Sequence, residues 1–319
     1  MAELFPRIEP YDHGWLPVGQ DNEIYWETSG NPAGRPAVVV HGGPGSGATA
    51  GWRRYFDPSR YRIILFDQRG CGRSRPSALD PAVSLEHNTT AHLIADLEHL
   101  RAHLGAARWL LLGASWGATL SIAYAEEHPD AVAAIVLMAV TNTTPGEVAW
   151  LTRDIGRLFP AEWERFAAGV PTAERDGNLA AAYARLLASP DPDVRFAAAR
   201  DWCAWEDALV KVHPGSRANP RYDDPDFRYL FARIVTHYLA HAAFIPDGQL
   251  LARADRLAGI PGVLAHGRLD VGSPLVTAWR LAQAWPDAEL VIGEDEGHGF
   301  RDPSVLVEAV ARMATAGRW

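Results

Sequence analysis

The chain carries the segment Trp109-Leu110-Leu111-Leu112-Gly113-Ala114-Ser115-Trp116-Gly117, in which an apolar run leads into the pattern Gly-x-Ser-x-Gly. The run has the length and composition of a buried strand, and a helical pattern follows it as far as about Glu127. Glycines on both sides of a serine fit a strained turn from strand to helix, because larger neighbours would clash there. The segment therefore predicts that Ser115 is a nucleophile presented at the end of a parallel strand.

Other apolar runs before and after this segment predict the rest of a sheet. They are continuous rather than alternating, which indicates a mostly parallel sheet with helices on both faces. The predicted strands are residues 37–40, 62–66, 109–112, 131–139, 262–266 and 288–292, and the predicted helices are residues 90–104, 116–127, 277–284 and 304–314. The fold class is therefore α/β.

The pattern changes between residues 143 and 245. It is helical throughout, rich in Ala, Arg, Trp and Asp, and contains no convincing strand. A chain of 319 residues is also about twice as long as one small domain usually needs. We therefore predict an α/β core made of residues 1–142 and 246–319, with an all-helical cap of residues 143–245 inserted into it.

Composition excludes several classes of function. Lys and Arg number 30 against 39 Asp and Glu, and the formal charge of −9 argues against partners such as nucleic acid or an anionic membrane. The longest apolar run, Ala131–Val140, spans ten residues, whereas a bilayer-spanning helix needs about 20. Only two cysteines, Cys71 and Cys203, are present, and the N-terminal residues lack a secretory pattern. We expect a cytoplasmic protein.

Two later strands end in residues that complete a catalytic triad with Ser115. Asp270 follows the strand at 262–266, and His298 follows the strand at 288–292. A serine hydroxyl is a poor nucleophile without an adjacent base and an orienting acid. Either residue alone could simply cap a helix or form a turn, but the order Ser, Asp, His at successive strand ends is typical of the α/β-hydrolase fold. We therefore predict that these three residues are catalytic.

The tetrahedral intermediate of such a reaction needs backbone N–H donors for its oxyanion. One donor follows the nucleophile and is the N–H of Trp116. The other is expected from the loop after the strand at 37–40, where Gly42 and Gly43 allow close approach of bare backbone. We assign Gly43 and Trp116 to the oxyanion hole, and we interpret His41 as a packing residue of the loop.

At this point the chain resembles a known family, the proline iminopeptidases (prolyl aminopeptidases) of the α/β-hydrolase fold. The resemblance rests on His41-Gly42-Gly43-Pro44-Gly45, Asp67-Gln68-Arg69-Gly70-Cys71-Gly72-Arg73-Ser74, Gly113-Ala114-Ser115-Trp116-Gly117, Gly267-Arg268-Leu269-Asp270, Gly297-His298, Phe159-Pro160-Ala161-Glu162-Trp163 and Trp202-Cys203-Ala204-Trp205-Glu206. These motifs span nearly the whole chain, and the run that begins at Asp67 is the most specific of them.

The resemblance implies that the cap covers the active site and that Glu206 binds the free amino terminus of the substrate. A carboxylate suits this role because it forms charge-assisted hydrogen bonds with a cationic amine. Glu206 could instead be an ordinary surface charge, and Trp205 beside it could form a pocket wall or only pack the cap. We take Glu206, Gly42 and Trp205 as candidate substrate-binding residues.

Two positions depart from the family pattern. The family usually has a second amine-binding glutamate in an Arg-Ile-Glu-x-His-Tyr segment, and this chain has Val235 there. The family also tends to have an aromatic residue of the proline pocket where this chain has Thr141. We infer that the acyl-side residue need not be proline.

The resemblance and the residues together predict a serine aminopeptidase that releases an N-terminal amino acid from a small peptide or aminoacyl substrate. No metal and no organic cofactor are expected, because protein groups supply the nucleophile, the base and the oxyanion donors. Three alternatives stay open: an esterase or amidase, a biosynthetic tailoring hydrolase or acyl transferase, and a ligand-binding protein on a hydrolase scaffold. Aromatic residues of the cap could also be subunit contacts, which leaves a homo-oligomer open.

Overall fold

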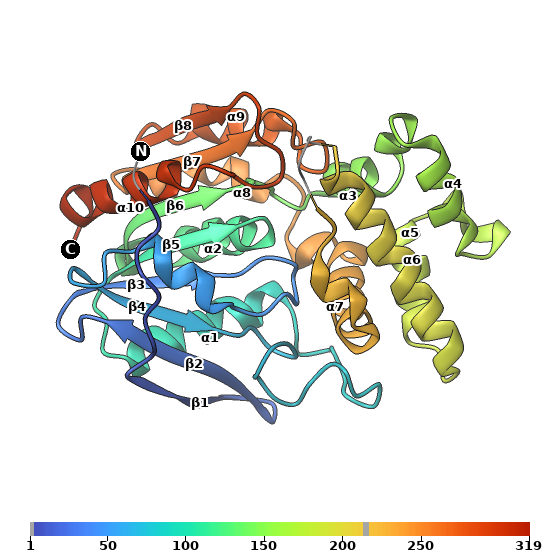
Figure 1. Cartoon of the computed structure of the whole chain (residues 1–319), viewed down its shortest axis with the longest axis horizontal. Coiled ribbons are helices and arrows are strands. Elements are labelled where there is room, and N and C mark those ends of the chain that lie inside the picture. The colour runs from blue at the N-terminus through green and yellow to red at the C-terminus, as the bar shows by residue number, and fades with distance from the viewer. Residues whose placement is uncertain (1–2, 213–216) are drawn as a thin grey trace.

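The computed structural model describes residues 3–212 and 217–319. One eight-stranded sheet organises the chain, with the strand order β1-β2-β4-β3-β5-β6-β7-β8 (Figure 1). The strands are β1 (Asp12–Gly19), β2 (Asn22–Gly30), β3 (Arg35–Val40), β4 (Tyr61–Phe66), β5 (Trp109–Ala114), β6 (Val132–Met138), β7 (Gly262–Gly267) and β8 (Ala288–Gly293). β3 to β8 are parallel, and β1 and β2 are antiparallel. The predicted α/β class with a mostly parallel sheet is confirmed.

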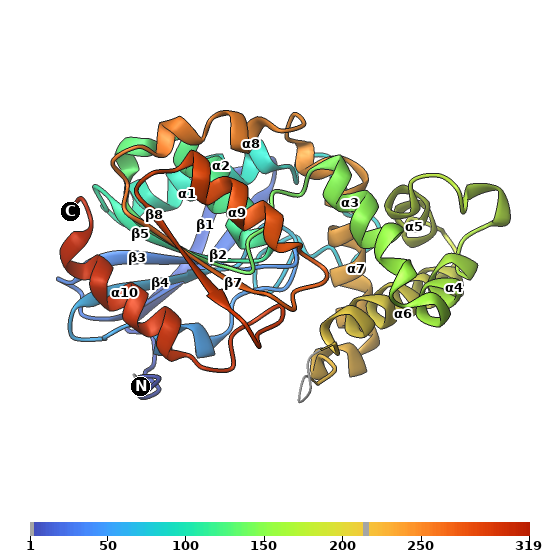
Figure 2. The ribbon, with the colours of Figure 1, turned by 90° about the horizontal axis from the view of Figure 1, so that it is seen from above.

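Helices cover both faces of the sheet. They are α1 (Thr90–His103), α2 (Trp116–Glu127), α8 (Gln249–Ala252), α9 (Leu275–Ala284) and α10 (Ser304–Ala316). Alternate residues of β3 divide between two apolar clusters, because successive side chains of a strand point to opposite faces. Val38 and Val40 pack with α1, α2 and α9, whereas Ala37 and Val39 pack with α10. α10 lies on the opposite face of the sheet from α1, α2 and α9 (Figure 2). This burial on both faces explains why the parallel strands read as continuous apolar runs.

A group of helices between β6 and β7 lies beyond one end of the sheet (Figures 1 and 2). Its members are α3 (Pro145–Thr152), α4 (Pro160–Ala168), α5 (Leu179–Leu187), α6 (Pro192–Val210) and α7 (Pro225–Ala240). Four of these helices begin with proline, which is tolerated at the first helical position because that N–H has no partner within the helix. The group has its own apolar cluster, which includes Phe166, Tyr183 and Trp202. We call this group the cap.

A buried ion pair fixes the loop that follows β4. Arg69 donates to both carboxylate oxygens of Asp96 on α1, with N–O distances of 2.6 and 2.7 Å. It also donates to the carbonyl oxygens of Val18 and His87. Both charged side chains are almost fully buried. The loop at residues 67–74 is therefore attached at once to α1, to β1 and to the chain before α1.

Replacing Asp96 with alanine leaves the Arg69 guanidinium buried without its counter-charge. We expect Asp96→Ala to lower the free energy of unfolding by about 3 kcal/mol, near the lower end for a broken buried pair. The matched control is Glu289→Ala, which breaks a pair with Arg312 in which both side chains are about half exposed, and it should cost less than about 1 kcal/mol. Denaturant unfolding of both variants measures the difference, and equal losses would contradict this account.

Candidate active site

Ser115 occupies the turn between β5 and α2 in a conformation that non-glycine residues rarely adopt, with φ 55° and ψ −124°. The two flanking glycines permit the close packing of this turn. A Cβ atom on Gly117 would lie 1.9 Å from the carbonyl oxygen of Val40, and one on Gly113 would lie 2.5 Å from the carbonyl oxygen of Gly117. The pattern Gly-x-Ser-x-Gly is therefore required by contact between β3, β5 and the first turn of α2.

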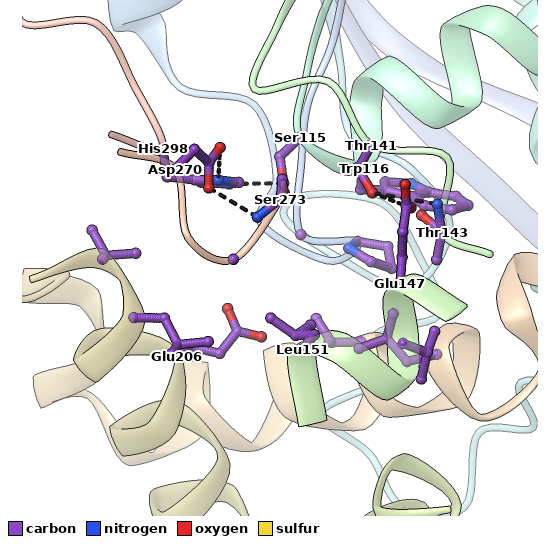
Figure 3. A pocket seen from close by; sticks show the side chains of 18 residues that line it. Ser115, Trp116, Thr141, Thr143, Glu147, Leu151, Glu206, Asp270, Ser273 and His298 are labelled. Atoms are coloured by element: carbon purple, nitrogen blue, oxygen red, sulfur yellow. Dashed lines mark hydrogen bonds and ion pairs between the residues drawn. The ribbon is translucent and has the colours of Figure 1, made fainter. Parts of the chain in front are cut away.

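The structure brings Ser115, His298 and Asp270 together in one chain of hydrogen bonds (Figure 3). His298 Nε2 lies 3.0 Å from Ser115 Oγ, and His298 Nδ1 lies 2.9 Å from Asp270 Oδ2. The other oxygen of Asp270 accepts a hydrogen bond from the backbone N–H of Ser273, at 3.0 Å. The loops after β7 and β8 thus bring an acid and an imidazole to the serine at the end of β5.

Burial and neighbouring charges act in opposite directions on the pKa values of Asp270 and His298. Burial opposes ionisation of Asp270, but the charge and the hydrogen bond of His298 outweigh it, so the pKa of this carboxyl lies below its ordinary value. Burial likewise opposes a charged His298, and Asp270 and Glu206 outweigh it, so the pKa of the imidazole is raised. With Asp270 ionised, Nδ1–H donates to it, and Nε2 is left to accept the proton of Ser115.

Gly43 and Trp116, whose backbone amides we assigned to the oxyanion hole, both line the cavity at Ser115. Within residues 3–212 and 217–319, neither amide donates to a protein acceptor. Gly43 has φ 114°, and a Cβ atom there would lie 2.7 Å from the N of Gly45 and 2.8 Å from the N of Ser46. This conformation favours glycine, because a Cβ atom would clash with the following backbone. Because the amide has no acceptor among the described residues, it can donate to a ligand.

Gln68 links the two segments that carry these amides, and the sequence patterns gave no indication of this. Its side-chain N–H donates to the carbonyl oxygen of His41 at 2.8 Å, and its side-chain oxygen accepts from the indole of Trp116 at 2.9 Å. Its backbone N–H donates to Nε2 of His41 at 3.1 Å. His41 is buried, and burial lowers the pKa of its imidazole. It is a packing residue of the loop, as the sequence suggested.

Ser115 opens into a cavity of about 110 Å³ between the sheet and the cap. Its apolar wall comes from the cap and contains Val148, Leu151, Leu209, Val235 and Leu239. Glu206 on α6 lies across the cavity from Ser115 and His298, with its carboxylate directed into the gap (Figure 3). Burial raises the pKa of Glu206 to about 7, against the hydrogen bond from Trp202 Nε1 at 2.9 Å and the charge of His298.

Comparison with known proteins agrees with this arrangement. The family model for the alpha/beta hydrolase fold matches residues 36–300. A probable proline iminopeptidase of Streptomyces coelicolor is 54% identical over 320 residues, which cover 98% of this chain and 98% of the relative. The chain belongs to the proline iminopeptidase family of α/β-hydrolases.

Other comparisons point the same way. The proline iminopeptidase of Xylella fastidiosa (strain Temecula1) is 43% identical over 305 residues, which cover 95% of this chain and 96% of the relative. The crystal structure of a proline iminopeptidase from Mycobacterium smegmatis superposes with a TM-score of 0.62, covering 96% of this chain and 99% of that one. Its identity of 18% makes it evidence for the fold alone. The resemblance seen in the motifs is therefore confirmed.

Trp205, which we took as a candidate substrate-binding residue, lies outside the cavity at Ser115. Trp205 is buried inside the cap, where its ring stacks on Phe166 at a centroid distance of 5.2 Å and its indole N–H donates to the carbonyl oxygen of Leu151. It does not line the cavity at Ser115. The Trp-x-x-Trp-Glu motif therefore contributes Glu206 to the site and Trp205 to the core of the cap.

Gly42 lies against the turn that holds the nucleophile. A Cβ atom there would be 2.8 Å from the carbonyl oxygen of Ala114 and 3.3 Å from the Cβ of Ser115. Gly42 lines a second cavity beside Ser115, which is described below. Contact with substrate at this residue stays a prediction.

Val235 and Thr141 both line the cavity, so both positions that depart from the family pattern border the space beside Ser115. Glu147 places a second carboxylate in the cavity, and the sequence motifs did not predict it. Glu147 accepts from the hydroxyl of Thr141 and the backbone N–H of Asn142, both at 2.9 Å, and from the hydroxyl of Thr277. The pattern Thr-x-x-Glu before an apolar run, which is typical of a helix N-terminus, could have revealed it.

Among the described residues, no helix combines the length and apolar character needed to cross a bilayer. The two cysteines are both buried and unpaired. Burial raises the pKa of the Cys71 thiol, which keeps this group protonated although it lies close to His41. Neither cysteine therefore competes with Ser115 as a nucleophile.

A fluorophosphonate probe tests whether the hydrogen-bonded chain activates Ser115. We expect the wild type to be labelled at Ser115, Ser115→Ala to lose labelling, and Asp270→Asn to react at least about 100-fold more slowly. Ser273→Ala is the matched control, because Ser273 borders the same cavity but contacts Asp270 only through its backbone N–H. Mass spectrometry of the labelled peptide gives the site. Labelling that persists in Ser115→Ala would exclude this residue as the nucleophile.

Proposed function

We propose that this chain is a serine aminopeptidase that releases proline or another small N-terminal residue from peptides and aminoacyl amides. The single observation that carries the proposal is the carboxylate of Glu206, which faces Ser115 and His298 across a small apolar cavity. An exopeptidase must recognise a cationic amine close to the scissile bond, and a half-buried carboxylate does this through charge-assisted hydrogen bonds. The names of the relatives, proline iminopeptidases, support the same activity.

In the proposed reaction, Ser115 Oγ attacks the carbonyl carbon of the N-terminal residue while His298 Nε2 takes the hydroxyl proton. The amides of Gly43 and Trp116 stabilise the oxyanion, and Asp270 stabilises the imidazolium. The scissile C–N bond then breaks, and His298 delivers the proton to the leaving amine. A water molecule attacks the acyl-enzyme, again with His298 as base, and releases the amino acid and Ser115.

Glu206 is the only carboxylate we assign to the substrate amine. Val235 cannot supply a second one, and the oxygens of Glu147 are already bound to Thr141, Asn142 and Thr277. Losing one charged contact weakens amine binding by about 1.5–3 kcal/mol relative to a site with two. The apolar wall then contributes a larger share of substrate binding, which favours small apolar acyl residues besides proline.

We further propose that the chain divides into a core of residues 1–142 and 246–319 and a cap of residues 143–245, and that the enzyme is cytoplasmic. The separate apolar cluster of the cap supports the division. Two unpaired buried cysteines fit a reducing compartment.

Neutralising Glu206 tests the amine-binding role. We expect Glu206→Gln to raise KM for prolyl-naphthylamide about 10- to 100-fold, because the bound ammonium loses its counter-charge. KM for an N-acetylated ester should change less than about threefold, since such a substrate carries no charge there. Glu164→Gln is the control, because it makes the same charge change on an exposed face of the cap. Equal effects on both substrates would remove Glu206 from amine binding.

The pH dependence offers an independent test. At low pH both Glu206 and His298 are protonated, so Glu206 carries no charge to bind the substrate amine and His298 cannot act as a base. We expect kcat/KM to rise with pH as both groups lose their protons, and Glu206 loses its proton near pH 7. We expect log(kcat/KM) to rise with a slope approaching about 2 at acid pH in the wild type and about 1 in Glu206→Gln. Above about pH 8 the substrate amine loses its own proton, and kcat/KM should fall. Steady-state assays from pH 5 to pH 9 measure the profile, and identical slopes would contradict the proposal.

A further inference from the structure

A second cavity adjoins Ser115. Its volume is about 480 Å³, and it shares Gly43, Ser115, Glu206 and His298 with the smaller cavity of about 110 Å³. The small cavity has room for one residue on the acyl side of the scissile bond. The larger cavity therefore lies where the leaving part of the substrate must go.

The cap side of the second cavity combines apolar side chains, such as Val210 and Phe231, with cationic ones. The chain between α6 and α7 contributes Arg217, Asn219, Pro220, Arg221 and Tyr222 to it, and the core contributes Ser46, Thr49 and Trp52. Two acids line it, Glu206 and Asp207, and Glu206 is the residue that we assign to the substrate amine. The carboxylate of Asp207 accepts from the backbone N–H of Asn219 at 2.9 Å and lies 3.9 Å from Lys211 Nζ. The charged side chains that the segment between α6 and α7 adds to the cavity, Arg217 and Arg221, are both positive.

Arg221 is the half-buried cation of this wall. Its guanidinium lies 4.0 Å from the ring centroid of Phe227. In the part of the chain that the structure describes, no carboxylate pairs with it and no oxygen accepts a hydrogen bond from its side chain. Two arginines of the core differ, because Arg69 pairs with Asp96 and Arg73 pairs with Asp67 and Glu27.

Leaving a guanidinium half-buried without an acceptor is unfavourable. Burial lowers the pKa of Arg221, which is the sign of this desolvation. Asp67, whose charge acts in the opposite direction, is already bound by Arg73 and by the backbone N–H of Ala48. A ligand that brought a carboxylate into the cavity would supply the missing acceptor with the planar geometry that arginine prefers.

We propose that Arg221 binds the C-terminal carboxylate of short peptides, so that the enzyme acts best on peptides that end one or two residues after the scissile bond. The inference rests on the proposed aminopeptidase function and names its substrate class. Glu206 binds the ammonium at one end of such a peptide and Arg221 the carboxylate at the other, with the scissile carbonyl at Ser115 between them. A longer or amidated peptide places no negative charge in the second cavity.

The test compares prolyl-alanine with prolyl-alaninamide, which differ only in the terminal carboxylate. The measured quantity is the ratio of their kcat/KM values. We expect a wild-type ratio of about 10 or more, and a fall of about tenfold in Arg221→Gln through the KM of prolyl-alanine. Arg221→Lys keeps the charge without the planar fork and should restore part of the ratio. Arg200→Gln, on an exposed face of α6, is the matched control and should leave the ratio unchanged.

Three outcomes are decisive. A wild-type ratio near 1, or an equal ratio in wild type and Arg221→Gln, overturns the assignment of Arg221. A wild type that prefers prolyl-glycyl-glycyl-glycyl-glycine to both prolyl-alanine and prolyl-glycyl-glycine overturns the preference for short peptides. A wild type that cleaves neither these peptides nor prolyl-naphthylamide instead refutes the proposed function itself. Thermal unfolding of Arg221→Gln shows whether a lost ratio reflects a lost fold.

Discussion

The hydrogen bond between Asp270 and His298 is the contact on which the rest of the site depends. A buried carboxylate is costly unless it is paired, and the imidazole together with the N–H of Ser273 keeps Asp270 ionised. The same bond fixes the orientation of the ring and therefore which nitrogen faces Ser115. Other contacts position the groups that act with this pair. Gly113 and Gly117 let α2 approach β3, which places Ser115. Gln68 joins the two segments that carry the backbone amides of Gly43 and Trp116.

Glu206 is coupled to this pair by charge. The negative charge of Glu206 adds to that of Asp270 in raising the pKa of His298. The charge of His298 in turn partly opposes the rise that burial causes in the pKa of Glu206. In the proposed mechanism, a substrate ammonium bound to Glu206 neutralises that negative charge. Its influence on the imidazole then weakens, and His298 releases its proton more readily. Binding of the correct substrate thereby favours the neutral imidazole, which is the form that can act as a base.

Sequence motifs predicted the parts of the molecule that local chemistry determines. The parallel strands are apolar on both faces, and the serine turn needs glycines, so both leave patterns in a short stretch of sequence. Asp270 and His298 were found because each follows a strand in a fixed order. The structure brings His298 to hydrogen-bond distance from Ser115, and Asp270 to hydrogen-bond distance from His298.

Features that depend on distant contacts were missed. The antiparallel pair β1 and β2 was not predicted, because β1 is a largely exposed edge strand with Gly14 and Pro17, and β2 buries polar residues such as Glu27. Glu27 is buried because Arg53 and Arg73, far along the chain, pair with it. Trp205 was assigned to the substrate side because it precedes Glu206. One residue along a helix turns the side chain by about 100°, which places its ring in the core of the cap.

In the proposed function the core provides the reaction and the cap provides amine recognition. One of the two departures from the family pattern, Val235, lies in the cap, and the other, Thr141, follows β6 of the core. Ser115, Asp270 and His298 come from loops at the ends of three core strands, and their geometry tolerates little change. Glu206, Val235 and Arg221 come from the cap, and Val235 belongs both to the apolar cluster of the cap and to the wall of the cavity at Ser115. Valine at position 235 can therefore replace a carboxylate without disturbing the nucleophile, because no hydrogen bond of the triad passes through α7. Arg221, which has no carboxylate partner among the described residues, is half-buried in the second cavity. In the proposed substrate recognition, the cost of its desolvation is offset when a carboxylate binds.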